Sequence, residues 1–340
     1  MENFLLNGEE LESYNYIIMC NNIMLSLVKR ANRSDWNSVK IKFKENDKND
    51  LKKYDVEYLR LNGYRKEINK MYYQHMFFSI LSDYLDYTYE ANTAASKMKI
   101  SIAYSLLRRP LKDNLYFLEI LENKGIEFMD DFLERPIEEF SIDKIYSEEK
   151  RNVINNVAKE VFSEAYGEFL YNVRYSKKEE IGLERIWNKT QHIITNCKYY
   201  KTEDGNLNMI FNDDKNIKDF VAYFYNIMPT ICTYVLKLTL KILQNLGLIN
   251  EIEYEINNII ITNRYLKFSK VGENIKLDKF LDETFLICPR CYKEINDKDI
   301  LNRWHLICPY CKKKINLDRF LFYNCHKEGE EYKSGRYAKE

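Results

Sequence analysis

Apolar residues recur every three or four positions along most of region 9–248, which is the period of an amphipathic helix. Clear rows of this kind cover 64–89 and 147–175, and a longer apolar stretch covers 216–246. The pattern therefore predicts a mainly α-helical protein with several long helices.

Three stretches depart from the helical period. Residues 34–54 indicate a loop or a short strand, and residues 200–214 indicate an irregular connection. Residues 250–284 fit two structures, because apolar residues alternate from Ile252 to Ile256 as in a strand, yet the run could equally be a helix.

Glycine and proline are scarce, with 10 and 5 residues in the whole chain. β-Sandwiches and barrels use many Gly and Pro turns, and phosphate-binding loops of the Rossmann and P-loop types need clustered glycines. The composition argues against all of these folds. Three of the prolines, Pro110, Pro136 and Pro229, are expected to punctuate helices, and Pro110 fits the first turn of one.

The 52 basic and 52 acidic residues cancel, which argues against a chain that coats nucleic acid over its whole surface. The start lacks a basic signal-peptide region, and Lys237 and Lys241 interrupt the longest apolar stretch. We expect a cytoplasmic protein with no membrane contact. In that setting eight cysteines favour metal binding over disulfides.

Two CPxC motifs give the strongest chemical signal. They are formed by Cys288 and Cys291 and by Cys308 and Cys311, and their separation falls in the range of about 15 to 20 residues that is typical of zinc sites. Zinc binds four thiolates tetrahedrally, and each motif offers two. We predict one structural Zn²⁺ held by these four residues, against the alternative of chance pairs or a redox dithiol.

The surroundings of the motifs predict a small β zinc ribbon. Apolar pairs at 286–287 and 306–307 precede each motif as short strands would. Tyr292 and Lys312 occupy positions where zinc ribbons often have Gly, so each needs an unusual backbone angle or a looser turn. Three further side chains are spare ligands that we expect outside the metal's first shell: His305, Cys325 and His326.

The ribbon region, 284–327, is basic. It holds nine Lys or Arg against four Asp or Glu, a net charge of +5, which leaves −5 for the remainder. Aromatic residues lie between the charges: Tyr292, Trp304, Tyr310 and Phe320. The module could therefore bind phosphates and bases of RNA or DNA, or its charges could simply face water.

A second motif lies in the helical region. On a continuous helix Arg185 and His192 would share one face, since seven residues turn through about 700°. Arginine can bind a phosphate and histidine can move a proton near neutral pH. The pair suits metal-independent RNA cleavage, in which a 2′-hydroxyl attacks the adjacent phosphate.

This Arg-x6-His arrangement within a helical domain resembles the HEPN superfamily. The resemblance implies a helical bundle, a homodimer with facing motifs, and RNA cleavage in antiviral or toxin–antitoxin defence. It makes Arg185 the phosphate-binding residue and His192 the catalytic one. Ile186 departs from the pattern, because the residue after the arginine is often polar in that family.

A second stretch adds to the resemblance, which covers roughly 65–245. The segment 105–119 is similar to a Leu-Leu-Arg…Glu helix of HEPN-like bacterial proteins, and it brings Arg108 and Arg109 in as candidate site residues. Other readings stay open: an ion-pair network around Pro110, and His192 as a hydrogen-bonded residue at a helix end. His75 is expected in the core or at its boundary.

The sequence thus predicts a mainly α, HEPN-like multi-helix bundle with a small C-terminal zinc ribbon. We expect the helical domain at 1–265, a connector at 266–283, the ribbon at 284–327 and a charged tail at 328–340. The predicted function is that of a zinc-binding, nucleic-acid-associated protein of a defence or stress system, with ribonuclease activity in the helical domain. The alternative is a non-catalytic interaction or sensor module in which zinc is purely structural.

Overall fold

A computed structural model describes most of the chain up to residue 270 and part of the C-terminal region. The residues described are 6–33, 36, 38–43, 55–208, 214–270, 286–287, 291, 293–295 and 305–316. The chain forms two compact units, Met1–Ile249 and Asn250–Glu340. The expected tail at 328–340 and most of the expected connector lie outside the described residues.

The structure confirms that the protein is mainly helical. The main helices of the first unit are α1 (Gly8–Arg33), α2 (Val56–Leu59), α3 (Arg65–Ser96), α4 (Ile100–Arg109), α5 (Leu115–Lys124), α6 (Phe128–Glu134), α7 (Ser147–Val161), α8 (Ala165–Tyr175), α9 (Leu183–Gln191) and α10 (Asp214–Asn245). The second unit holds α11 (Glu251–Ser269) and four short strands, β1 (Leu286–Ile287), β2 (Glu294–Ile295), β3 (His305–Ile307) and β4 (Lys314–Asn316). No described helix has the length and apolarity needed to cross a bilayer.

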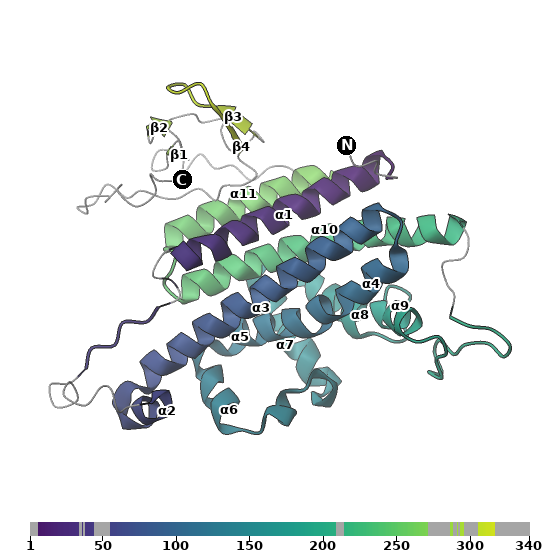
Figure 1. The fold of residues 1–340 in the computed structure, drawn as a ribbon, viewed down its shortest axis with the longest axis horizontal. Helices are drawn as coiled ribbons and strands as arrows, with labels where there is room; N and C mark the ends of the chain where they lie inside the picture. The colour runs from purple at the N-terminus through teal and green to yellow at the C-terminus, as the bar shows by residue number, and fades with distance from the viewer. Residues whose placement is uncertain are drawn as a thin grey trace. The chain divides into compact units, whose positions relative to one another are not determined.

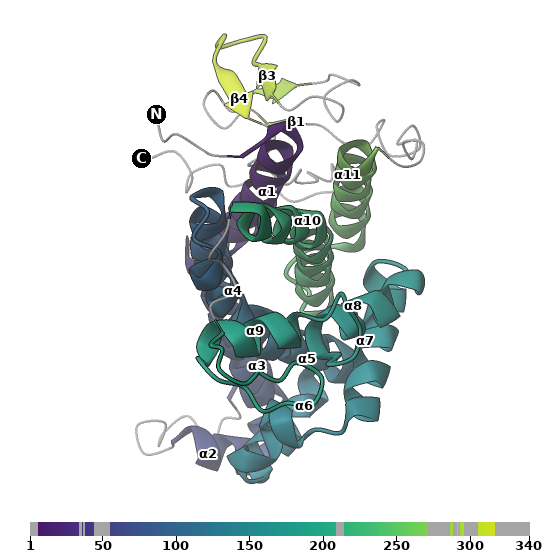
Figure 2. The same cartoon turned by 90° about the vertical axis from the view of Figure 1, so that its right-hand side faces the viewer.

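Helix α10 forms the centre of the first unit. It packs against α1 on one side and against α5 and α7 on another, and α3 lies beside α1, α4 and α5 (Figures 1 and 2). Every residue of α10 from 231 to 240 is buried. A helix that is surrounded by others must be apolar on all faces, which explains its long apolar sequence.

A buried ion pair joins α8 to α5. Arg174 and Glu119 have fully buried side chains, and Arg174 Nη1 lies 2.6 Å from Glu119 Oε1. Arg174 Nε also donates to the Leu111 carbonyl at 2.7 Å, and the hydroxyl of Tyr234 on α10 donates to Glu119 Oε1 at 3.0 Å. Burial raises the pKa of Glu119, while Arg174 and Tyr234 act in the opposite direction. The pair therefore fixes α5, α8 and α10 to one another.

A second ion pair fixes α9. Lys112 Nζ lies 2.8 Å from Glu184 Oε1, and both side chains are buried. Lys112 also contacts the exposed Asp143 at 3.2 Å, and this contact holds the pKa of Asp143 below its usual range. Because Glu184 belongs to the first turn of α9, the contact sets where that helix starts.

The prolines behave differently from expectation at two positions. At Pro110 the chain stays helical and widens into a π-helical turn, Pro110–Asn114, in which the Leu115 N–H reaches back to the Pro110 carbonyl. Proline lacks an N–H and crowds the preceding turn, and a wider turn accommodates both effects. Pro229 lies inside α10 instead of at an end. Pro136 does separate α6 from the next helical turn.

Two helix boundaries also differ from the apolar pattern. The single row expected over 147–175 is divided into α7 and α8, with Phe162 in a non-helical conformation at the break. The ambiguous region after residue 250 begins as a helix, α11. The Asn250 side chain accepts the Glu253 N–H at 2.8 Å, which is the hydrogen bond of a helix N-cap.

We predict that Arg174→Met lowers the free energy of unfolding by about 3 to 5 kcal/mol, because it leaves the Glu119 charge buried without its partner. Arg174→Met/Glu119→Leu should recover most of this loss, since it removes both charges. Urea denaturation measures the effect. Arg151→Met, which breaks an exposed pair with Glu168, is the control and should cost less than about 1 kcal/mol. A double variant no more stable than Arg174→Met would contradict the prediction.

Lys237 gives a pH-dependent prediction. Burial lowers its pKa to about 8, and its ammonium lies 5.2 Å from the centre of the Phe162 ring. The unfolded state then binds more protons between about pH 8 and 10.5, so stability rises with pH across this window and is reduced below it. Lys237→Met should therefore raise the free energy of unfolding at pH 7 by roughly 1 to 3 kcal/mol.

The gain in stability from Lys237→Met should shrink as the pH approaches the pKa of an unperturbed lysine, about 10.4. Denaturation at pH 7 and pH 10 measures this change, with the exposed Lys218→Met on the same helix as control. Equal gains at both pH values, or a gain for Lys218→Met as large as for Lys237→Met, would count against a buried charge at Lys237.

Candidate functional site

Two small hairpins carry the cysteine motifs. Strands β1 and β2 pair antiparallel, with Leu286 opposite Ile295, and β3 pairs with β4, with Ile307 opposite Lys314. Cys291 lies in the connection of the first hairpin, and Cys308 and Cys311 lie in that of the second. The apolar pairs before each motif are therefore strands, as the sequence predicts.

The second hairpin turns tightly around its two thiols. The Cys308 N–H donates to the Lys313 carbonyl at 2.9 Å, and the Lys312 N–H donates to the Cys308 carbonyl at 3.0 Å. Lys312 has φ +58°, a left-handed backbone conformation. Of the two alternatives expected at this glycine-like position, an unusual angle or a looser turn, the unusual angle is present. Tyr292, the matching residue of the first motif, lies outside the described residues.

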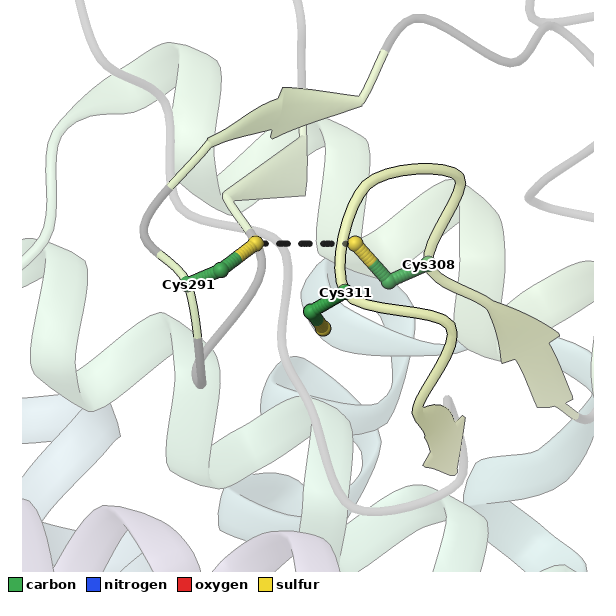
Figure 3. Close-up of side chains that lie close together, drawn as sticks. All are labelled: Cys291, Cys308 and Cys311. Atoms are coloured by element: carbon green, nitrogen blue, oxygen red, sulfur yellow. Dashed lines mark hydrogen bonds between the residues drawn. The ribbon is translucent and has the colours of Figure 1, made fainter.

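Three thiols converge between the hairpins. The Sγ atoms of Cys291, Cys308 and Cys311 all lie within 4.8 Å of one another, and Cys291 Sγ is 3.6 Å from Cys308 Sγ (Figure 3). Sulfur atoms bound tetrahedrally at about 2.3 Å from zinc are separated by about 3.8 Å. The three side chains could therefore hold a metal ion. Cys288, the fourth predicted ligand, lies outside the described residues.

The three cysteines of the first unit do not belong to this cluster. Cys20 on α1 and Cys232 on α10 are buried, as expected of core residues. Cys197 is only half-buried and lies in the loop after α9. The pKa of its thiol is below the ordinary value, because hydrogen bonds from Tyr199 and Tyr200 and the charge of Lys177 outweigh burial.

The arginine and the histidine of the Arg-x6-His motif lie at opposite ends of α9. Arg185 is half-buried in its first turn, whereas His192 is exposed and follows the last helical residue, with φ −126° and ψ 127°. The continuous helix assumed for this pair thus stops one residue short. The Asn208 side chain donates to the His192 carbonyl at 2.7 Å, so this carbonyl is bound to the loop instead of extending the helix.

The two arginines at the end of α4 have partners of their own. Arg109 Nε lies 3.0 Å from Asp83 Oδ2, and its guanidinium lies 5.5 Å from the centre of the Tyr87 ring. Arg108 is half-buried, and its charge helps to lower the pKa of Asp143. Helix α4 packs against α9, but within 55–208 no hydrogen bond or ion pair joins either arginine to Arg185 or His192.

A cleft that the sequence did not indicate lies elsewhere in the first unit. It has a volume of about 820 Å³ and is formed where α3 begins and where α5 and α10 end, with Arg65, Asn69, Asn123 and Asn245 among its lining residues. None of the four candidate catalytic residues lines it. Its residues come from three distant segments that share no motif, so no local signal could have revealed it.

His75 is exposed on α3, so the core or boundary position expected for it is wrong.

Comparison with known proteins does not assign a family or a function to these residues. No family model, no curated protein and no solved structure matches the chain.

Proposed function

We propose that the protein binds one structural Zn²⁺ and associates with nucleic acid through the metal module, the two hairpins β1–β2 and β3–β4 that carry the cysteines. The observation that supports this most directly is the convergence of Cys291, Cys308 and Cys311 within 4.8 Å. Cys288 supplies the fourth thiolate in this proposal. Four thiolates leave zinc no open position for water or substrate, so the ion stabilises the two hairpins and takes no part in catalysis.

The surface of the module supports an anionic partner. The described exposed side chains between 291 and 314 include four lysines and no acidic group: Lys293, Lys312, Lys313 and Lys314, with Ile307, Pro309 and Tyr310 between them. The sequence of the whole ribbon region carries a net charge of +5. Lysines that neutralise phosphates release counterions from nucleic acid, which is the main source of such binding.

We further propose metal-independent ribonuclease activity in the helical unit. The exposure of His192 favours it, because a catalytic histidine must reach the 2′-hydroxyl of an RNA strand. His192 accepts that proton, and Arg185 at the other end of α9 binds the phosphate, with Arg108 and Arg109 on the neighbouring α4. The HEPN-like bundle, a homodimer and a role in defence belong to this proposal through the resemblance.

One observation favours the alternative of a non-catalytic interaction module. Ile193 and Ile194, directly after His192, have exposed fractions of 62% and 61%. Two adjacent exposed isoleucines offer apolar surface that a partner protein could cover. In this alternative the partner covers the end of α9 and no RNA is cleaved.

The metal proposal predicts about one zinc ion per purified chain by elemental analysis. Cys291→Ser/Cys308→Ser should lose the ion, because it removes a ligand from each hairpin, while Cys197→Ser should keep it. Chelation should unfold the hairpins and leave the helical circular-dichroism signal of the first unit largely intact. Purified protein without zinc, or equal zinc in both variants, would contradict the proposal.

The ribonuclease proposal predicts cleavage of single-stranded RNA without added divalent cations. His192→Ala should lower the rate by roughly 100-fold to 10,000-fold, the usual contribution of a general acid or base. His75→Ala removes an exposed histidine from α3 and should have no effect. If wild type and His192→Ala cleave equally, or neither cleaves, the activity does not belong to this site and the interaction module is favoured.

A further inference from the structure

The turn after Cys311 contains a lysine where glycine would fit better. Lys312 has φ +58°, a conformation that costs a side-chain-bearing residue stability relative to Gly. Its backbone N–H makes the bond to the Cys308 carbonyl, and glycine could make the same bond. The turn alone therefore gives no reason for lysine. Backbone strain of this kind clusters at functional sites, and the Lys312 side chain is exposed.

Tyr310 presents an aromatic ring on the same turn. Its exposed fraction is 53%, so a ligand can reach the side chain. Lys293, from the other hairpin, places its ammonium 5.0 Å from the centre of this ring. The thiol cluster, which joins the two hairpins, therefore also brings an aromatic ring next to a cation.

Three exposed lysines continue directly from the turn into β4: Lys312, Lys313 and Lys314. The ring and these cations lie within five consecutive residues, so one short ligand segment could contact both. A ligand that suits this surface has flat aromatic faces and a repeated negative charge.

We propose that this turn binds single-stranded nucleic acid, with one base stacked on Tyr310 and the flanking phosphates on Lys312, Lys313 and Lys314. The inference rests on the proposed function and specifies its ligand. In a duplex the base faces are already stacked and hidden, whereas a single strand leaves them free for an aromatic side chain. Major-groove binding needs a helix or a long two-stranded ribbon, and β3 and β4 have only three residues each.

The test uses the full-length, zinc-loaded protein and fluorescence anisotropy. The probes are a labelled mixed-sequence 12-mer as single-stranded DNA, as single-stranded 2′-O-methyl RNA, which cleavage through a 2′-hydroxyl cannot consume, and as duplex DNA. Both single strands should bind at least 10-fold more tightly than the duplex. Tyr310→Ala should weaken single-strand binding by roughly 5-fold to 100-fold, and Tyr310→Phe should retain it.

The lysine is tested by Lys312→Gly, which relieves the backbone strain and removes the cation. Zinc content should stay the same and thermal stability should stay equal or rise, while single-strand affinity falls and its dependence on log salt concentration becomes shallower by about 0.7. Lys270→Gly is the matched control, since Lys270 also has positive φ, at the end of α11. It should leave both the affinity and the salt dependence unchanged.

Two sets of results overturn the inference while the proposed function stands: equal or tighter binding of the duplex, or zinc-loaded Tyr310→Ala and Lys312→Gly proteins that bind as the wild type does. An affinity loss in Lys270→Gly as large as in Lys312→Gly also overturns it, because the effect would then be one of total charge. Failure of the zinc-loaded wild type to bind any probe overturns the nucleic-acid association itself. Absence of zinc overturns the metal proposal instead.

Discussion

The packing of the helical unit depends on a guanidinium that has no exposed surface. Arg174 on α8 must satisfy its charge inside the protein, and it does so through Glu119 on α5 and the Leu111 carbonyl. The hydroxyl of Tyr234 brings α10 into the same network. A buried charge without its partner costs several kcal/mol, so these helices can shift relative to one another only by breaking the network.

The position of the candidate catalytic helix follows from this network. The hydroxyl of Tyr175, next to Arg174, donates to the Lys112 carbonyl at 2.6 Å, and the Lys112 ammonium pairs with Glu184 at the start of α9. The far end of α9 is set by Asn208, which binds the His192 carbonyl. Buried charges thus determine where α9 begins, and a polar loop determines where it ends and exposes His192.

The metal module is organised by a different physical constraint. Within the described residues its strands have only two or three residues each, which is too few to bury a sizeable apolar core. Thiols from both hairpins meet at one point, and metal coordination could supply the stability that packing does not. With little of the chain needed for a core, side chains such as Tyr310 and Lys312 remain on the surface, where they can contact a ligand.

The sequence by itself determined the helical class and the strands before the cysteine motifs, because each follows from local periodicity or spacing. At Lys312 it left two possibilities, an unusual angle or a looser turn, and the structure decided for the unusual angle. It left region 250–284 open, and the structure, with Asn250 as N-cap, decided for a helix over Glu251–Ser269, while 271–284 lie outside the described residues. The interruption between α7 and α8, the π-turn at Pro110 and the end of α9 before His192 were likewise decided in three dimensions. The pairing of Arg174 with Glu119 and the cleft at the ends of α3, α5 and α10 belong there too. The end of α9, the buried ion pair and the cleft depend on residues far apart in the chain, whose contacts no local pattern encodes.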